Sequence, residues 1–153
     1  MNRIDFYSTR DPYGEFSNFA KFRLWLKEKY WPTSEHYFQA QKFAGTSHEE
    51  EVRNAPTAMK AAQMGRERHR PLRPDWEAVK EDVMLEALRT KFSQHKSLRS
   101  LLLDTGDAEL VEHTANDAYW GDGGDGKGLN RLGEILMQVR EAILQERKGL
   151  APN

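Results

Sequence analysis

Apolar and polar residues alternate in two short stretches of the chain, and a third short stretch also predicts β-structure. The segment from Ile4 to Ser8 alternates weakly, which predicts a short strand. From Phe22 to Trp31, aromatic and branched residues alternate around a polar tip at residues 27–29, a pattern typical of a β-hairpin. Residues 109–114 predict one more short strand. These strands are few and short, so any sheet that they form is small.

Helical spacing dominates the rest of the chain. Thr33 or Ser34 is a suitable N-cap for a helix over 33–44, and Gly45 is a suitable stop. Pro56 opens a second helical stretch that reaches about Arg68. Further helices are expected over 75–94, around 98–102, and from near Asn130 to the end of the apolar face at Ile143. We therefore expect a helix-rich α+β fold, with residues 1–153 in a single domain.

Composition and charge exclude several classes of protein. A chain of 153 residues that is 38% hydrophobic and 10% aromatic can bury a real core. Its 23 Lys and Arg against 24 Asp and Glu lack the basic excess of proteins that hold bulk nucleic acid. The absence of cysteine excludes disulfides, thiolate nucleophiles and cysteine-based zinc sites. With neither a secretory signal nor an apolar run of membrane-spanning length, we expect a cytoplasmic protein without membrane contact.

The helix predicted over 33–44 carries the first candidate site. Glu35, Gln39 and Lys42 fall at i, i+4 and i+7 and so share one face. Glu35 and Lys42 stand about 10 Å apart along the axis, too far for an ordinary salt bridge but able to reach opposite ends of one ribosyl group. Spacing alone favours a solvated polar face. His36 is more typical of a packed or solvated side chain than of a catalytic one, and no ligand spacing predicts a metal site.

The second candidate is the glycine-rich stretch NDAYWGDGGDGKGLN, residues 116–130. Gly121, Gly123 and Gly126 match a dinucleotide fingerprint as a string, but no apolar strand or βαβ unit surrounds them. A calcium loop is excluded because no Glu closes it at the twelfth position. The glycines instead favour a flexible backbone that approaches a ligand closely, at Gly121 and before the helix that opens at Asn130.

Two side chains at the entrance of this loop have suitable chemistry for a site. Asp117 offers a carboxylate for acid–base or hydroxyl-binding work, and Trp120 offers a ring for stacking on a base. An ordinary surface loop with Trp120 anchored in the core accounts for the same residues equally well.

Two further segments are weaker candidates. Arg66, Arg68, Arg70 and Arg73 form a local basic cluster whose guanidinium forks suit phosphate oxygens. Cations at a helix C-terminus are common, and on sequence alone this structural role is favoured. Asn18, between aromatic residues, suits either the reading of a base edge or the capping of a turn.

Together these segments resemble the YbiA-like family, also called NADAR, whose members include N-glycosidases acting on riboflavin-biosynthesis intermediates. The matching stretches include FYSTRDPYGEFSNF, WPTSEHYFQAQKF, MGRERHRPLRPDWEAVKEDVM and LVEHTANDAYWGDGGDGKGLNRLG. They run from about Asp5 to Arg140 in family order. The resemblance implies a compact α+β domain that hydrolyses a ribosyl–nitrogen bond without a cofactor.

The resemblance implies two classes of substrate. One is the 5-phosphoribosylamino pyrimidines of early flavin synthesis, and the other is ADP-ribose attached to guanine in nucleic acid. In both, ribose is joined to an exocyclic amino group of a guanine-like ring and carries phosphate. The near-neutral charge favours the small phosphoribosyl molecule as partner. A non-enzymatic alternative is a module that binds ADP-ribose or NAD without hydrolysis.

This linkage suggests a mechanism. The ribosylamine can open to an imine, so Lys42 is expected to act as a Schiff-base nucleophile or as a cation that stabilises the opening sugar. Glu35 or Asp117 would be the general acid/base. In the alternative, one carboxylate supports an oxocarbenium-like sugar while the other directs water. Substrate binding is assigned to the other candidates, namely Asn18, Gln39, Arg66, Arg70, Trp120 and Gly121.

Overall fold

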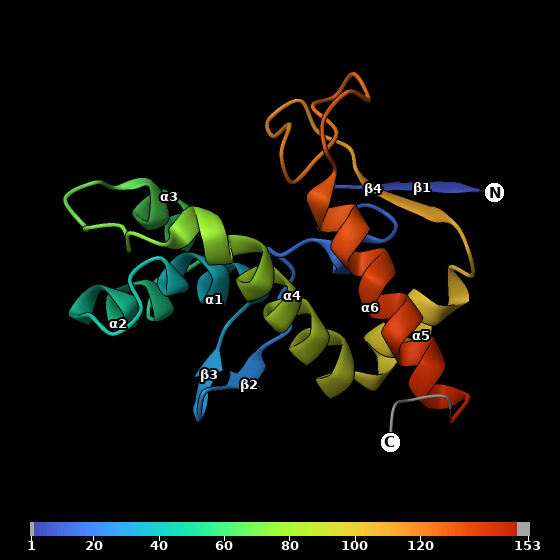
Figure 1. Cartoon of the computed structure of the whole chain (residues 1–153), viewed down its shortest axis with the longest axis horizontal. Coiled ribbons are helices and arrows are strands. Elements are labelled where there is room, and N and C mark those ends of the chain that lie inside the picture. Colours follow the sequence, from blue (N-terminus) through green and yellow to red (C-terminus); the bar gives the residue numbers. More distant parts are fainter. Residues whose placement is uncertain (1, 150–153) are drawn as a thin grey trace. The chain divides into compact units, whose positions relative to one another are not determined.

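The computed structural model describes residues 2–149, and the chain divides into two compact units (Figure 1). The central unit is Asn18–Gln94. The terminal unit combines the described residues up to Ser17 with those from His95 onward. The helix-rich α+β class is confirmed, although the strands form two separate two-stranded sheets in place of the single small sheet expected.

The central unit begins with the predicted hairpin. Strands β2 (Leu24–Leu26) and β3 (Lys29–Trp31) pair antiparallel, with Leu24 opposite Trp31. Lys27 and Glu28 form the tip and both have positive φ, 56° and 61°. Two consecutive left-handed residues are what a type I′ hairpin turn requires. The alternation read from the sequence therefore located both strands and the turn.

Four helices complete the central unit. They are α1 (Ser34–Gln41), α2 (Ser47–Arg53), α3 (Ala58–Arg66) and α4 (Trp76–Gln94). Helix α1 begins after Thr33, whose side chain accepts a hydrogen bond from the His36 amide and so caps the helix as expected. The predicted helix over 33–44 is three residues shorter at its end, because residues 42–44 continue as turns.

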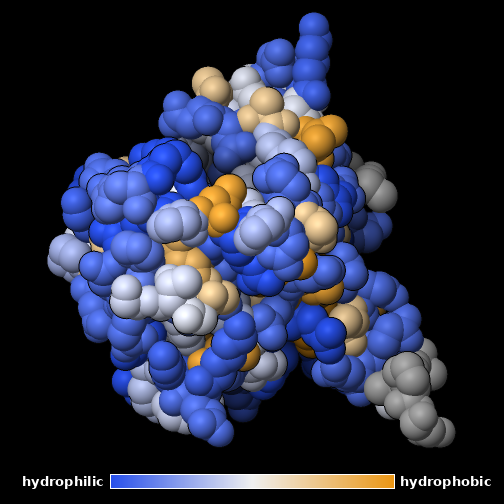
Figure 2. Space-filling view, turned by 60° about the vertical axis from the view of Figure 1, so that its left-hand side comes forward, coloured by the Kyte–Doolittle hydropathy of each residue, from blue (hydrophilic) through white to orange (hydrophobic). Residues whose placement is uncertain are grey.

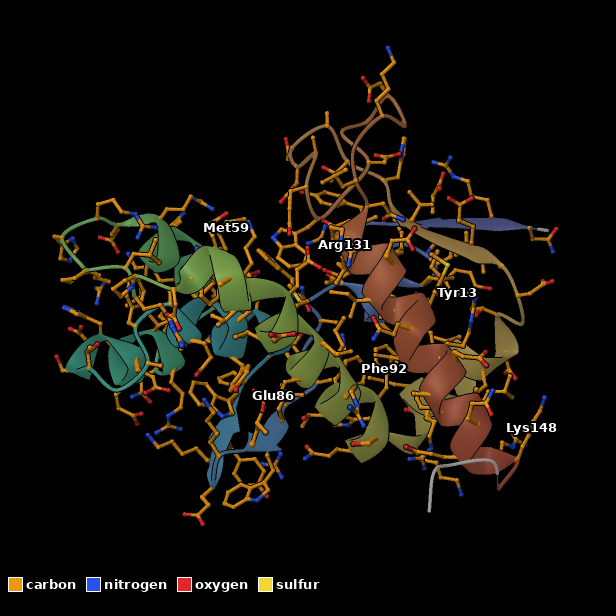
Figure 3. The ribbon with its side chains drawn as sticks, viewed as in Figure 1. Tyr13, Met59, Glu86, Phe92, Arg131 and Lys148 are labelled. Atoms are coloured by element: carbon orange, nitrogen blue, oxygen red, sulfur yellow. The ribbon has the colours of Figure 1, made fainter. Side chains whose placement is uncertain are left out.

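Helix α1 is buried along its whole length. All eight of its residues are buried, because α2, α3 and α4 all pack against it. Tyr37 and Ala40 belong to the apolar core of the unit, and the Tyr37 hydroxyl donates to Glu86. Glu86 is a residue of α4 and is labelled in Figure 3. The solvated polar face that spacing alone favoured for this helix is therefore wrong. Its polar side chains lie inside the helix packing.

The terminal unit is built on a parallel strand pair. Strands β1 (Arg3–Phe6) and β4 (Glu109–Glu112) pair with Ile4 opposite Leu110. Helix α6 (Arg131–Arg147) packs on β4 (Figure 1). The approach is close, since a Cβ on Gly133 would lie 2.0 Å from the Leu110 carbonyl oxygen. The unit also contains the short 3-10 helix η1 (Gly14–Phe16) and helix α5 (Lys96–Asp104).

The surface is largely polar. The face shown in Figure 2 is mostly hydrophilic, with small and scattered hydrophobic patches. None of the helices within residues 2–149 combines the length and the apolar character needed to cross a membrane.

Candidate functional site

Glu35 and Gln39 lie one turn apart on α1 and are both buried. Each is only 8% exposed. The side-chain amide of Gln39 donates through Nε2 to Oε1 of Glu35 over 3.1 Å, so the shared face predicted from the i, i+4 spacing is confirmed for this pair. Oε1 of Gln39 is buried without a hydrogen-bond partner among the described residues. The pair therefore combines a hydrogen-bonded carboxylate, that of Glu35, with an acceptor that has no partner among the described residues, Oε1 of Gln39.

Lys42 follows α1 directly, as its C-cap residue. Its Nζ donates to the carbonyl oxygen of Gly65 in the last turn of α3 over 3.3 Å and lies 5.9 Å from the Trp76 ring centroid. The guanidinium of Arg68 donates to the same Gly65 oxygen over 2.6 Å. Two cationic groups thus share one uncharged acceptor.

The surroundings of Lys42 lower the pKa of its amine. Partial burial is the main cause, and the nearby charges of Arg68 and Arg66 add to it, while Glu35 and Glu77 act in the opposite direction. The net effect brings the pKa from 10.5 to about 8. A lysine with this pKa has a substantial neutral fraction near neutral pH, which a nucleophilic amine needs.

The arginines expected to bind phosphate differ from each other. Arg66 is exposed and forms no ion pair with a carboxylate of residues 2–149. Arg70 is 9% exposed, and its guanidinium forms an ion pair with Glu51 at 2.6 Å and a longer one with Glu67 at 3.7 Å. Arg70 therefore stabilises the contact with α2, and a phosphate role for it stays a prediction.

Asn18 holds the start of α1. Its Oδ1 accepts from the Ser34 hydroxyl over 2.6 Å, its Nδ2 lies 3.4 Å from the Met84 sulfur, and its backbone carbonyl accepts from the Glu35 amide over 3.1 Å. Of the two roles that the sequence left open, these contacts match the structural one. The reading of a base edge stays a prediction.

His36 is packed rather than catalytic, as expected. It is 1% exposed and its ring nitrogens lie 2.8 Å from the Thr33 hydroxyl and 3.0 Å from the Ala55 carbonyl. Burial lowers its pKa, so the ring stays neutral at physiological pH.

In the terminal unit, Asp117 organises the entrance of the glycine-rich loop. Its Oδ1 accepts from the backbone amides of Tyr119 and Trp120, over 2.9 and 2.8 Å. Trp120 is half-buried and packs edge-on against the Tyr119 ring. A Cβ on Gly121 would lie 2.8 Å from the Asp117 and Glu112 carbonyl oxygens, so this glycine is required by the packing of the loop itself.

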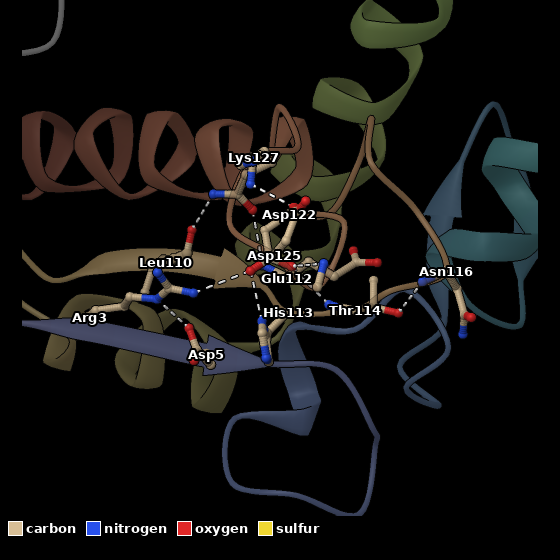
Figure 4. Close-up of polar contacts among 12 residues, drawn as sticks. Arg3, Asp5, Leu110, Glu112, His113, Thr114, Asn116, Asp122, Asp125 and Lys127 are labelled. Carbon is tan, nitrogen blue, oxygen red and sulfur yellow. Dashed lines mark hydrogen bonds and ion pairs between the residues drawn. The ribbon is translucent and has the colours of Figure 1, made fainter.

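Asp122 fixes the same loop and is a residue that the sequence interpretation missed (Figure 4). It is 3% exposed and accepts from the His113 ring over 2.7 Å and from the amides of Thr114 and Gly124 over 3.1 and 2.8 Å. Arg3 of β1 adds a contact at 3.3 Å. Burial alone would raise the pKa of Asp122, but these donors outweigh it and lower the pKa to about 2.

These contacts change the interpretation of the loop. The amides of Arg131 and Leu132, at the start of α6, donate to the carbonyls of Tyr119 and Trp120 over 3.0 Å each (Figure 3). Those two donors are satisfied by the loop and do not await a ligand. The flexible backbone expected from the glycines is instead a hydrogen-bonded scaffold that presents Asp117 and Trp120. Residues 2–149 contain no group of three His, Asp or Glu side chains arranged to hold a metal ion.

Comparison with known proteins finds relatives that match nearly the whole chain. The NADAR domain model matches residues 5–144. The chain is 60% identical over 144 residues to N-glycosidase YbiA of Escherichia coli, a match that covers 94% of this chain and 90% of that protein. The chain belongs to the NADAR family. It is also 46% identical over 143 residues to an N-glycosidase of Nostoc punctiforme, with 92% of each chain covered.

Two more comparisons complete the placement of this NADAR protein. A chloroplastic riboflavin biosynthesis protein, PYRR of Zea mays, is 40% identical over 94% of this chain but 25% of that longer protein. The NMR structure of Escherichia coli YbiA matches with a TM-score of 0.90 and 57% identity, over 99% of this chain and 90% of that one. The predicted family and fold are confirmed, as is the reaction class of an N-glycosyl hydrolase.

Proposed function

We propose that this enzyme hydrolyses the bond between ribose C1 and an exocyclic amino group of a guanine-like pyrimidine. The substrates would be the 5-phosphoribosylamino pyrimidine intermediates of riboflavin biosynthesis, and one product would be ribose 5-phosphate. The observation that carries the proposal is a buried carboxylate on α1, Glu35, together with an amine of lowered pKa at the end of the same helix, Lys42, whose pKa the charge of Glu35 influences. The names of the Escherichia coli and Zea mays relatives support the reaction and the substrate class.

The chemistry proceeds through the open form of the sugar. The ribosylamine opens to an imine at C1, and the neutral Lys42 amine adds to that carbon. The pyrimidine amine then leaves with a proton from Glu35, which leaves the sugar bound to Lys42 as an imine. Water adds to C1, releases the sugar and regenerates both side chains. With a pKa of about 8, about a tenth of Lys42 is neutral at pH 7, against about three in ten thousand at the ordinary pKa of 10.5.

A non-covalent route uses the same residues differently. Lys42 then acts as a cation beside the opening sugar, while a carboxylate directs water to C1. The two routes differ in whether the sugar is ever attached to the protein.

Substrate binding is divided among the other candidates. We assign the phosphate to Arg66, because it is exposed and has no carboxylate partner among the described residues. Trp120 would stack on the base and Asp117 would act as the second carboxylate. These roles of Asp117 and Trp120 stay predictions, as does a cytoplasmic location.

Two measurements test the proposal. Purified protein is incubated with a 5-phosphoribosylamino pyrimidine and, in parallel, with an oligonucleotide that carries ADP-ribosylated guanine, and the released sugar phosphate is quantified. Release from the first substrate alone supports the proposal, and release from the second alone contradicts its substrate assignment. Binding of ADP-ribose without release from either would show a binding module.

Borohydride reduction during turnover then separates the two routes. A ribose 5-phosphate adduct on Lys42, located by mass spectrometry, is expected from the covalent route. A fully active enzyme that yields no adduct would leave only the non-covalent route.

A further inference from the structure

Gly65, in the last turn of α3, lies against the Gln39 side chain that donates to Glu35, and its carbonyl accepts a hydrogen bond from Lys42. We propose that Gly65 is a positioning residue for Glu35, through the space it leaves for Gln39, and for Lys42, through its backbone carbonyl. This inference rests on the function proposed above for α1. The sequence alone indicated no role for Gly65.

The first contact is steric. A Cβ placed on Gly65 would lie 1.9 Å from Oε1 and 2.7 Å from Cδ of Gln39, distances that real Cβ atoms do not show. The obstacle is the side-chain amide that donates to Glu35 over 3.1 Å. Gln39 is 8% exposed, so this amide has little room to withdraw without leaving the carboxylate. Only glycine at position 65 leaves the amide in its place against Glu35.

The second contact is polar. The carbonyl of Gly65 accepts the Lys42 ammonium over 3.3 Å and the Arg68 guanidinium over 2.6 Å. Carbonyls in the last turn of a helix have no intrahelical partner and carry the negative end of the helix dipole, so they attract cations. This acceptor fixes the direction of the amine, and because it is uncharged it favours the ammonium form less than a carboxylate would.

The backbone gives no separate reason for a glycine here. Gly65 lies within α3, and its φ is not among the positive values of the chain. In a helix, glycine is less stable than alanine by about 1 kcal/mol. The residue is therefore explained by what it contacts and not by its conformation.

A double-mutant cycle tests the steric part. Gly65→Ala is expected to lower kcat by about 10- to 100-fold with KM nearly unchanged, because a misplaced reacting group costs rate more than binding. Gln39→Ala removes the same support of Glu35 and is expected to lower kcat similarly. The double variant should be no less active than Gln39→Ala alone, because both changes act through one amide.

Stability within the same cycle gives an independent readout. Gly65→Ala should lower Tm in the wild-type background, where the new methyl group meets Gln39. In the Gln39→Ala background it should raise Tm, because the obstacle is gone and alanine favours the helix. Gln63→Ala, an exposed change on the same helix, is the control and should alter neither activity nor Tm.

The pH profile separates positioning from a general structural role. The Gln39 donor stabilises the ionised form of Glu35, so its loss favours the protonated form that acts as general acid, and the limb on which kcat falls as Glu35 loses its proton should move to higher pH in both single variants. Wild-type kcat and an unmoved limb in folded Gly65→Ala would overturn the inference. If Gly65→Ala alone does not fold, the double variant decides, and its failure to recover the fold would equally overturn the steric argument. Absence of sugar release by the wild type would instead reject the proposed function, while the Tm cycle would still test the contact.

Discussion

Replacing Lys42 by Met is expected to make the protein more stable and much less active at the same time. Methionine has a similar length and reach but no charge, and Lys42 is partly buried beside the Trp76 ring. At pH 7 the wild type must hold a charged amine in a site that disfavours the charge. The variant has no such requirement, so its free energy of unfolding should exceed that of the wild type.

The size of the gain follows from the pKa. A fall from 10.5 to about 8 sets an upper bound of about 3.4 kcal/mol, because one pH unit corresponds to 1.36 kcal/mol. The amine keeps its hydrogen bond to Gly65 and is not fully buried, so solvent screening reduces the value. We expect a gain of about 1–2 kcal/mol, which corresponds to roughly 2–8 °C in Tm for a protein of this size.

The dependence on pH is the sharper test. Between pH 8 and 10.5 the unfolded chain binds more protons at Lys42 than the folded chain, so the stability of the wild type rises with pH in this window. The advantage of Lys42→Met should therefore be constant below about pH 8 and disappear towards pH 10.5. Urea unfolding of both proteins at pH 6, 7, 8, 9 and 10 measures this difference in stability. Lys60→Met, at an exposed lysine, is the control.

Activity completes the experiment. If Lys42 is the nucleophile, sugar release by Lys42→Met should fall to background, while wild-type kcat should rise with pH through about 8 as the amine loses its proton. A Lys42→Met variant that is less stable than the wild type at pH 7 would show that the charge on Lys42 does not destabilise the folded protein. A stability difference that stays the same from pH 7 to 10 would show this as well.

Three further predictions concern the other charged groups. Arg66→Gln should raise KM by at least 10-fold without a change in Tm, as expected when a charge-assisted hydrogen bond to phosphate is lost. Arg70→Gln should instead lower Tm with KM unchanged, because it removes the ion pair with Glu51 at the α2 contact. Steady-state kinetics and thermal melts of both variants would show the opposite pattern if the two assignments were exchanged. Asp122→Ala should destabilise the protein by about 1–3 kcal/mol in urea unfolding, because the backbone amides of Thr114 and Gly124 lose their acceptor. The contribution of Asp122 should be fully present above about pH 4 and fade as pH falls towards 2, since its pKa is lowered from 3.8 to about 2, so an unchanged difference at pH 2 would contradict this explanation.

The elements with a strong local pattern were predictable from the sequence. The hairpin of β2 and β3 and the long helix α4 follow from period-2 and helical spacing within single segments. Helix α2 was missed, because its sequence SHEEEVR buries only Val52 and offers no apolar face to read. What fixes α2 is its Thr46 cap and its packing against α1, and the second of these is not local.

The arrangement of the candidate residues along α1 was partly predictable from the sequence, but their environment was not. The contact between Glu35 and Gln39 follows from one turn of helix, so spacing was sufficient. Their burial was not predictable, because it depends on the packing of α3, a separate segment of the chain, against α1. The lowered pKa of Lys42 has the same origin, since Gly65 and Arg68 reach it only through that packing.

The glycine-rich loop shows the reverse situation, in which composition suggested the wrong physical property. Many glycines permit flexibility, but several here are needed because backbone or side chains approach too closely for a Cβ. The decisive residue is Asp122, whose partners come from β1, from β4 and its continuation, and from the loop itself. A carboxylate in a polar stretch carries no local sign that it is buried.

The polar groups of α1 are themselves an argument for the location of the site, independent of any relative. A buried acceptor without a partner, such as Oε1 of Gln39, costs about 1–3 kcal/mol. Lys42 adds the cost of a disfavoured charge, and apolar side chains in both places would pack against α3 more stably. Gln39 and Lys42 are both destabilising, and Gln39 donates to the Glu35 carboxylate over 3.1 Å. Destabilising polar groups are expected to be retained where the chemistry of the site needs them. If this is correct, stabilising substitutions should concentrate around α1, and those at Gln39 and Lys42 should remove activity.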